Sequence, residues 1–189
     1  MTRQRRRQIL EAMASVVARD GLAGTTIMNV AAAAGLQRTL VLHYFRDRDE
    51  LMTAFIAEAV AAYGERMVLG EEGDSVEDRL DRLFEPGAYR HAEDLVVWTE
   101  LVALAARDTG VRHQLHELWT RRWLPAAEEQ LQAAYATAPA DRVAETAYAI
   151  AGLVEAQWAF HLQGLTDSTR RGQLRNAARA LVARLGERP

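Results

Sequence analysis

The chain has 189 residues, of which 49% are hydrophobic, and it carries a formal net charge of −3. It contains no cysteine, which excludes disulfides and thiolate metal sites, and no segment approaches the roughly 20 apolar residues that span a bilayer. Its arginine-rich start lacks the apolar block of a secretory signal, so we expect a cytoplasmic protein with no membrane partner. Alanine, leucine, arginine and glutamate are abundant and only four prolines occur, so we expect an all-α fold.

The charge is unevenly distributed along the chain. Residues 1–48 hold eight arginines against three acidic residues, a net charge of +5, which leaves −8 for the remainder. Every basic residue is arginine, whose planar guanidinium suits phosphates and guanine edges, although a genomic codon bias would give the same composition. A basic N-terminal region on an acidic body is typical of a protein in which only that region meets a polyanion.

Apolar spacing and helix-end signals predict four helices in the N-terminal region, at 3–19, 26–34, 38–44 and 47–69. Asp20 and Gly21 end the first helix, and Thr26 is a good N-cap for the second. Gly35 can adopt the left-handed conformation that stops the second helix. The second and third helices are therefore short and are joined by a turn that contains glycine.

A segment with two glycines and no apolar periodicity, residues 70–75, is the predicted domain boundary. Beyond it, apolar spacing predicts helices at 76–85, 90–107, 111–136, 140–163 and 168–185. Pro125 is expected to kink the third of these. We therefore predict a C-terminal helical bundle at 76–189, joined to residues 1–48 by a connecting helix at 49–69.

The two short N-terminal helices have the layout of a helix-turn-helix, because a three- or four-residue turn with glycine joins them inside a basic region. In the third helix, Val41 and Phe45 are four residues apart and can face the core, so the opposite side would meet a DNA major groove. Residues 1–48 are thus predicted to be a three-helix DNA-binding domain. The structural alternative is a short core helix in a bundle.

The outward side chains of this third helix have different predicted tasks. Arg38 would either hold guanine O6 and N7, which is worth about 1–3 kcal/mol of discrimination, or bind a phosphate. Thr39 and Gln37 can reach base edges or backbone, and Leu42 can pack on a thymine methyl group. Phosphate contacts are expected from His43 and Tyr44 of this helix, and from two residues outside it, Thr26 and Arg48.

Residues 5–56 resemble the N-terminal domain of the tetracycline-repressor (TetR) family. The resemblance implies a homodimeric repressor that binds a palindromic operator on double-stranded DNA and is released by an unknown small-molecule effector. It also implies that the C-terminal helices form both an effector pocket and the dimer interface. The matching elements are Arg7-x-Ile9-Leu10, Gly21, Gly24-Thr25-Thr26, Val30-Ala31, Ala34-Gly35, His43-Tyr44-Phe45 and Arg46-Asp47-Arg48-Asp49-Glu50-Leu51.

The chain departs from the family pattern around the third helix. Gln37 is a weak N-cap where the family usually has a small hydroxyl side chain. Thr39, Leu40 and Leu42 stand where the family commonly has glycine, threonine and tyrosine. These departures support a second hypothesis, a helical interaction module that kept the fold and lost specific operator binding.

The C-terminal body has a weaker family resemblance. The stretches that begin at Val96 and Ala149 look like the branch that contains the choline-responsive repressor of betaine synthesis. On physical grounds, the helices at 140–163 and 168–185 are the predicted dimer-forming pair, since two half-sites about 34–36 Å apart need a rigid two-fold joint. Their apolar surface is expected to come from Leu153, Trp158, Leu162, Leu174, Ala178, Leu181 and Leu185.

Four tryptophans and two glutamates suggest a pocket for a cationic effector, held by ring faces and a carboxylate. The opposing interpretation is that the aromatic side chains are ordinary core or interface residues, because large apolar residues at helical spacing usually pack. Glu155 could equally form a hydrogen bond across a dimer. The candidate pocket residues are Trp98, Glu100, Trp119, Trp123, Glu155 and Trp158.

The sequence pattern favours neither an enzyme nor a metal or cofactor site. His113-x-x-His116-Glu117 has neither the zinc-protease order nor an obvious third ligand, so we expect its histidines to be solvated or packing. No phosphate-binding glycine loop, nucleophile elbow or dinucleotide motif occurs. The cluster from Arg3 to Arg7 is either a solvated tail or an arm that contacts DNA, since such arms can enter a minor groove.

Overall fold

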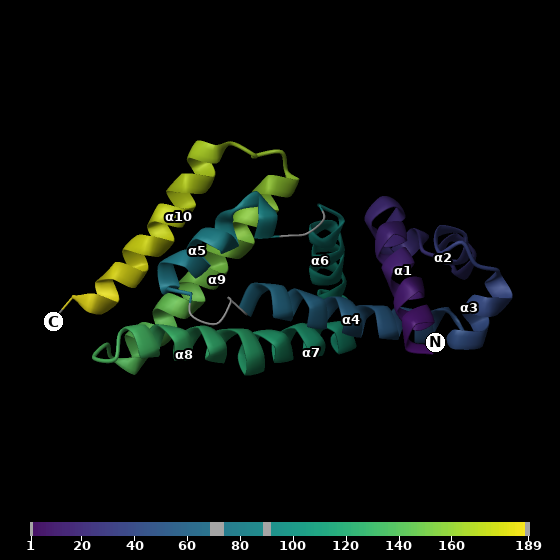
Figure 1. Cartoon of the computed structure of the whole chain (residues 1–189), viewed down its shortest axis with the longest axis horizontal. Helices are drawn as coiled ribbons and strands as arrows, with labels where there is room; N and C mark the ends of the chain where they lie inside the picture. Colours follow the sequence, from purple (N-terminus) through teal and green to yellow (C-terminus); the bar gives the residue numbers. More distant parts are fainter. Residues whose placement is uncertain (1, 69–73, 89–91, 188–189) are drawn as a thin grey trace. The chain divides into compact units, whose positions relative to one another are not determined.

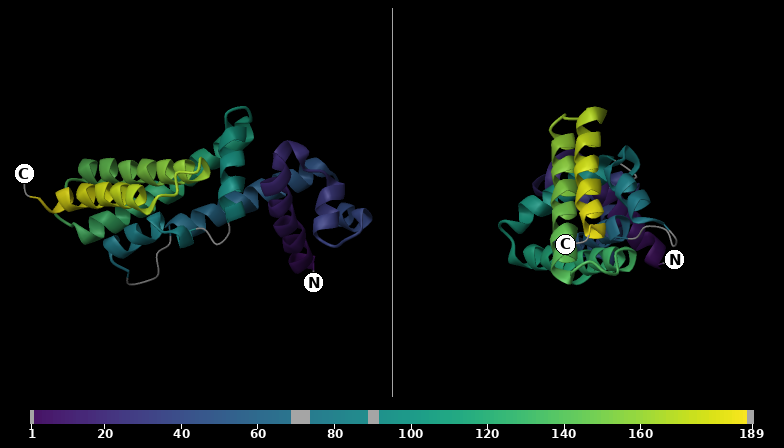
Figure 2. Two further views of the ribbon diagram at one scale, coloured as in Figure 1. Left: turned by 90° about the horizontal axis from the view of Figure 1, so that it is seen from above. Right: turned by 90° about the vertical axis from the view of Figure 1, so that its left-hand side faces the viewer.

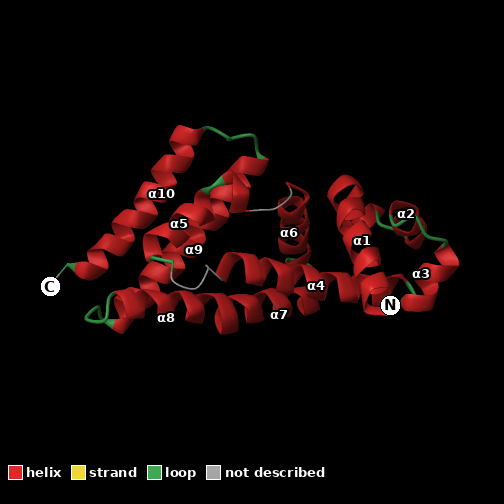
Figure 3. Ribbon diagram, viewed as in Figure 1, coloured by secondary structure: helices red, strands yellow, loops and turns green. Residues whose placement is uncertain are grey.

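The computed structural model describes residues 2–68, 74–88 and 92–187, and this part of the chain is helical without a strand (Figure 3). The predicted all-α fold is therefore confirmed. None of the described helices combines the length and apolarity that a membrane crossing requires. The α-helices are α1 (Thr2–Gly24), α2 (Ile27–Ala33), α3 (Arg38–Tyr44), α4 (Arg48–Val68), α5 (Val76–Phe84), α6 (Ala92–Ala105), α7 (Thr109–Leu118), α8 (Leu124–Ala134), α9 (Ala140–Leu162) and α10 (Ser168–Ala183) (Figure 1).

The chain folds into two compact units, which do not follow the predicted boundary. The first unit comprises Met1–Tyr63 and His91–Leu115, and the second comprises Gly64–Arg90 and His116–Pro189. In the first unit, α1 packs against α2 and α6, and α2 packs against α3. The segment that contains α6 thus belongs with the N-terminal helices. Most of the predicted boundary at 70–75 lies outside the described residues.

The core of the first unit is built from the apolar faces that the sequence predicts. Ile9, Met13 and Val17 of α1 are fully buried, as the three-to-four spacing requires, and so is Leu101 of α6. Burying a side chain of this size contributes about 1.5–3 kcal/mol, so these contacts hold the first unit together. The other buried residues of α1 to α4 include Val16, Val30, Val41, Phe45, Leu51 and Phe55.

The helical backbone of α1 is interrupted at Gly21, where the first helix was predicted to end. Gly21 has a φ of 71°, in the left-handed region that side chains other than glycine rarely adopt, and helical residues continue to Gly24. The bend leaves the backbone N–H of Leu22 free of the helix, and it donates to Glu100 Oε2 of α6 at 3.0 Å. Thr25 Oγ1 donates to the Gly21 carbonyl at 2.9 Å. The first helical run thus ends at Gly21 as predicted, a short helical turn to Gly24 follows, and α6 holds the bend between them.

In the second unit, α5 begins at a capping box in which the Ser75 hydroxyl accepts from the N–H of Asp78 at 3.1 Å. The apolar side of α5 buries Leu80 and Phe84, while its polar side pairs with arginines of α10. Arg179 donates to both carboxylate oxygens of Asp81, each at 2.6 Å. Helix α10 thereby covers α5 as well as α9.

The predicted helix at 111–136 is interrupted by a π-helical turn at Trp119–Trp123, which lies between α7 and α8. The N–H of Leu124 donates to the carbonyl of Trp119, a bond that spans five residues. Pro125 has no N–H, and its ring crowds the carbonyl four residues earlier, so a wider turn before it relieves that contact. The irregularity expected at Pro125 therefore falls in the preceding turn.

Helices α9 and α10 are antiparallel neighbours, which both views of Figure 2 show in green and yellow. One part of the predicted dimer surface is wrong, because Trp158, Ala178 and Leu185 are buried within the chain. Trp158 lies on α9 and Ala178 on α10, while Leu185 lies in the short 3-10 helix Arg184–Gly186 that follows α10. The large apolar side chains that α9 does expose are Tyr148, Phe160 and Leu162.

Candidate DNA-binding surface

The turn between α2 and α3 follows the predicted signals closely. Thr26 caps α2, since its hydroxyl accepts from the N–H of Asn29 at 3.1 Å. Gly35 has a φ of 65°, the left-handed conformation that ends α2. The N–H of Leu36 then donates to the carbonyl of Ala31 at 2.9 Å, which closes the turn. The helix end and the turn are therefore confirmed at the level of individual atoms.

Helix α3 has an inner and an outer side, as its spacing predicts. Val41 and Phe45 are completely buried. On the outer side, Arg38, Thr39 and His43 are exposed. The half-buried members of the predicted set are Leu42 and Tyr44.

The arginines around α3 differ in how their guanidinium groups are used. Within the described residues, Arg38 forms no hydrogen bond or ion pair, so its donors are available. Arg46 pairs with Asp47 at 3.0 Å. Arg48 donates from Nε to the Thr25 carbonyl at 2.8 Å and from Nη2 to the Leu22 carbonyl at 3.0 Å. Arg48 thus joins the start of α4 to the end of α1, and a phosphate contact by it stays a prediction.

Helix α4 begins at a charged cap. The carboxylate of Asp47 accepts from the N–H of Glu50 at 2.8 Å, and the Glu50 carboxylate accepts from the N–H of Arg46 at 2.9 Å. The hydrogen bond from the Glu50 N–H, followed by the one from the Arg46 guanidinium, holds the pKa of Asp47 below its ordinary value. The junction between α3 and α4 is therefore fixed by reciprocal bonds.

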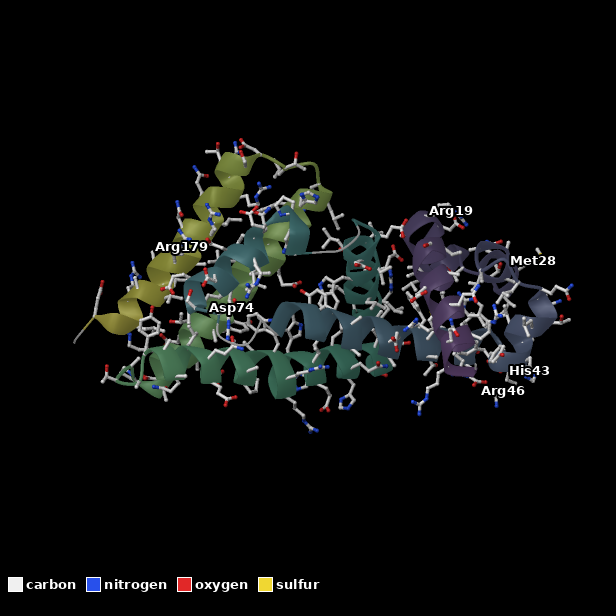
Figure 4. All side chains as sticks on the ribbon, viewed as in Figure 1. Arg19, Met28, His43, Arg46, Asp74 and Arg179 are labelled. Atoms are coloured by element: carbon white, nitrogen blue, oxygen red, sulfur yellow. The ribbon has the colours of Figure 1, made fainter. Side chains whose placement is uncertain are left out.

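Three residues near this surface lie outside the predicted set of DNA contacts, although one of them, Arg6, belongs to the cluster from Arg3 to Arg7 that was predicted to be either a solvated tail or a DNA-contacting arm. Met28 of α2 is 68% exposed, which is unusual for a large apolar side chain, and Figure 4 shows it with His43 on the N-terminal helices. Arg6 and Gln8 of α1 hydrogen-bond to carbonyls at the ends of α3 and α2. A signal for Arg6 was present, because it lies one helical turn before Ile9 and two before Met13 on the inward side of α1.

The predicted effector residues are divided between the two units. In the first, the Trp98 ring stacks on Tyr63 at a centroid distance of 3.5 Å, and the Glu100 carboxylate accepts from Leu22. Both side chains therefore have partners in the first unit. In the second unit, Glu155 of α9 is half-buried.

The remaining three tryptophans also belong to the second unit. Trp119 and Trp123 meet edge to face in the π-helical turn, with ring centroids 5.4 Å apart. The indole N–H of Trp123 is buried and has no hydrogen-bond acceptor among the described residues. Trp158 is buried, and its indole N–H donates to the Leu83 carbonyl at 3.2 Å. The structure thus brings Trp119 and Trp123 together and buries Trp158 against α5.

The histidines of the predicted His113-x-x-His116-Glu117 pattern lie on α7. Within residues 2–68, 74–88 and 92–187, no group of three or more histidine or acidic side chains is arranged to hold a metal ion. His113 and His116 are therefore not part of a metal-ion site among the described residues.

Comparison with known proteins finds a family match for the N-terminal helices. Residues 9–55, which run from α1 through the helix-turn-helix into α4, match the family model described as bacterial regulatory proteins, tetR family. The chain is also 23% identical over 169 residues to the HTH-type transcriptional regulator BetI of Escherichia coli O127:H6 (strain E2348/69 / EPEC), covering 82% of this chain and 80% of BetI. Residues 9–55 therefore form a helix-turn-helix domain of the tetR family.

Solved structures share the fold of this chain over nearly its whole length. A structure assigned to the TetR family from Rhodococcus sp. is 23% identical and superposes with a TM-score of 0.67, covering 97% of this chain and 100% of that one. A protein from Saccharomonospora viridis, solved in complex with choline, is 18% identical with a TM-score of 0.69 and covers 96% of each chain. The fold shared with these solved structures therefore extends through the second unit.

Proposed function

We propose that this chain is a homodimeric repressor of the TetR family, active in the cytoplasm and without enzymatic activity, that binds a palindromic operator and is released by a small-molecule effector. The observation that carries the proposal is the outer side of α3. There Arg38, Thr39 and His43 are exposed on a helix anchored by Val41 and Phe45. A basic, solvent-facing helix presented by a helix-turn-helix is suited to a major groove.

In this proposal the residues of the surface make different contacts with DNA. Arg38 reads a guanine through two hydrogen bonds, because its donors are unused and the guanidinium fork matches O6 and N7. Gln37 and Thr39 reach neighbouring base edges or backbone, and the half-buried Leu42 packs on a thymine methyl group. The phosphate contacts come from Thr26, His43, Tyr44 and Arg48.

The test is selection of a preferred duplex from a random-sequence library by the full chain, followed by titration of that duplex and of random duplex. We expect nanomolar binding to the selected duplex, with an affinity that falls as salt rises because arginine–phosphate contacts release counterions. Equal affinity for both duplexes would overturn specific repression.

Substitution of Arg38 tests its separate role. Arg38→Ala should reduce the preference for the selected duplex by about 10- to 100-fold if the guanidinium reads a base. If preference is kept and only the salt dependence becomes shallower, Arg38 is a phosphate contact. Arg19→Ala is the matched control, since Arg19 is an exposed arginine of the same unit that pairs with its neighbour Asp20.

We place the dimer interface on α9 and α10. Tyr148 is 72% exposed and Leu162 is 39% exposed on α9, and their spacing places both on one side of the helix. A second copy that covers this face would bury both side chains. Tyr148→Arg combined with Leu162→Glu should give a monomer in sedimentation equilibrium, while Val102→Glu, at an exposed apolar position of α6, should not change the oligomeric state.

For the effector we propose a cation with a hydroxyl group, bound by Trp119, Trp123 and Glu155. The support is the tryptophan pair, whose Trp123 N–H is buried without an acceptor within the described residues, together with the half-buried carboxylate. The structural relative in complex with choline makes choline the first probe. Choline should raise the unfolding temperature and weaken DNA binding, and Trp123→Phe should reduce both effects. If millimolar choline caused no change in the unfolding temperature, choline would be excluded as the effector.

A further inference from the structure

Helix α1 supplies side chains that bind the C-terminal ends of both helices of the helix-turn-helix. Arg6 Nη1 donates to the carbonyl of Tyr44, the last residue of α3, at 2.6 Å. Gln8 Nε2 donates to the carbonyl of Ala34, the C-cap of α2, at 2.9 Å. Two residues of one helix, two positions apart, thus hold two separate helix ends.

Arg6 makes a second contact that fixes its guanidinium in place. The guanidinium carbon lies 4.2 Å from the centroid of the Phe45 ring, directly after the end of α3. Phe45 is completely buried, so this ring is itself held by the core. A guanidinium stacked on an aromatic face while it donates to a carbonyl uses both of the properties that distinguish arginine from lysine.

The physical need for such contacts follows from the length of the helices. Helices α2 and α3 have seven residues each, which is too short to be stable without tertiary contacts. The last carbonyls of a helix have no partner within it, and a positive charge there complements the helix dipole. A cation on the Tyr44 carbonyl therefore stabilises α3 and defines its direction.

The other arginines of the cluster are placed differently. Helix α1 begins at Thr2, so the cluster is helical from its start and does not form an extended arm. Arg7 is 70% exposed and pairs with Glu11 at 3.4 Å, and Arg5 donates to Gln8 Oε1 at 2.7 Å. Among the arginines of this cluster whose contacts are described, Arg6 alone reaches α3.

We propose that Arg6 is a positioning residue for DNA recognition: it sets the orientation of α3 from behind, with Gln8 doing the same for α2, and it contributes to operator affinity without binding a phosphate. The inference rests on the proposed function, because it assumes that α3 reads a preferred sequence. In this proposal the positive charge of Arg6, although part of the basic N-terminal region, orients a helix and does not contact DNA.

The salt dependence of binding separates this role from a phosphate contact. Arg6→Gln should lower affinity for the duplex selected by the wild-type chain about tenfold or more. The slope of log affinity against log salt should stay unchanged, whereas a lost phosphate contact would reduce it by about 0.9. Affinity for random duplex should change less than that for the selected duplex. A reduced slope, or an equal loss on both duplexes, would overturn the proposal.

Arg6→Lys adds a test in which the charge is kept. An ammonium is a point charge that cannot lie flat on the Phe45 ring while it reaches the Tyr44 carbonyl, so lysine should recover only part of the lost affinity. Complete recovery by Arg6→Lys would show that charge alone is needed and would contradict the positioning role. If the wild-type chain itself selects no sequence, the proposed function fails first.

A measurement without DNA tests the positioning role even if the chain binds no preferred DNA sequence. In Arg6→Gln, amide hydrogen exchange at the end of α3, residues 41–45, should become several-fold faster, while the centre of α1 should be unaffected. Arg7→Gln is the matched control, since it removes the same charge from an exposed position one residue away and should leave α3 unchanged. Equal exchange in α3 for wild type and Arg6→Gln would refute the inference.

Discussion

The helices within the first unit and the helices within the second unit are joined by different kinds of polar interaction. In the first unit, side chains bond to the backbone at helix ends, as Arg6 does at α3, Gln8 at α2 and Arg48 at the end of α1. In the second unit, the polar links between α5 and α10 join one side chain to another, as in the pair of Arg179 with Asp81. Those links lie at the surface, above a buried apolar layer.

The difference follows from helix length. The seven-residue α2 and α3 bury few side chains, so directional bonds to their terminal carbonyls must define where they point. The 23-residue α9 and 16-residue α10 have several turns of apolar contact, so their packing depends less on such bonds, although Trp158 donates one to the Leu83 carbonyl of α5. Exposed ion pairs contribute only about 0–1 kcal/mol, so the second unit should depend on packing.

The largest effect is expected from a cavity in the second unit. Leu80 of α5 is 3% exposed, so Leu80→Ala should lower the free energy of unfolding by about 2–5 kcal/mol in urea denaturation. Leu165, in the connection between α9 and α10, is 45% exposed and serves as the matched control, for which Leu165→Ala should cost less than about 0.5 kcal/mol. Similar losses for both variants would contradict a packing-based second unit.

An intermediate effect is expected from the bond between α6 and the bend of α1. Glu100→Ala leaves the Leu22 N–H without its acceptor, which should cost about 1–3 kcal/mol. Glu100→Gln keeps a carbonyl acceptor and should recover most of that stability. Hydrogen exchange at the Leu22 amide gives the local readout. A Glu100→Gln protein as unstable as Glu100→Ala would show that the carboxylate charge matters more than the hydrogen bond.

Most of the fold could be predicted from the sequence because its signals are local. Thr26 and Gly35 set the ends of α2, and the spacing of Val41 and Phe45 sets the inner side of α3. The π-helical turn could not be predicted, since it depends on how Pro125 is accommodated among neighbouring helices. The association of α6 with α1 also depends on tertiary packing, which apolar periodicity does not specify.

The candidate site was predicted in its residue types and less well in its contacts. Arg38 and Arg48 have the same side chain, yet Arg48 is bonded to two carbonyls and Arg38 to none of the described groups. Only long-range packing distinguishes them. The dimer surface shows the same limit, because Trp158 and Leu162 lie on one helix but only Leu162 is exposed. Apolar spacing shows which residues share one side of a helix, but it does not show which other helix that side contacts.

A smaller pair of effects compares glycines in the two units. Gly21 has a φ of 71°, so Gly21→Ala should destabilise the first unit by about 1–2 kcal/mol through backbone strain. Gly172 lies inside α10 with open space around it, so Gly172→Ala should stabilise the chain by about 0.5–1 kcal/mol. Chemical denaturation measures both. Destabilisation by Gly172→Ala would show that α10 is tightly constrained at this point.

The smallest effect comes from two aspartates that cap helices in different units. Asp47 accepts from the N–H of Glu50, and Asp167 accepts from the N–H of Thr169 at 2.6 Å. In each, a backbone hydrogen bond is the main cause of a pKa below the ordinary value. Each carboxylate therefore stabilises the folded chain above its unfolded pKa of about 3.9, and loses that effect as pH falls through the lower folded pKa.

Asparagine is nearly as good an N-cap as aspartate, so Asp47→Asn and Asp167→Asn should reduce the unfolding temperature slightly at pH 7 and progressively less below about pH 4. The two variants should differ in hydrogen exchange. Asp47 lies between α3 and α4, so Asp47→Asn should also speed exchange at the end of α3, while Asp167→Asn should leave α3 unchanged. If neither variant alters α3, the cap of α4 stabilises its own helix only, and the orientation of α3 depends on the contacts from α1.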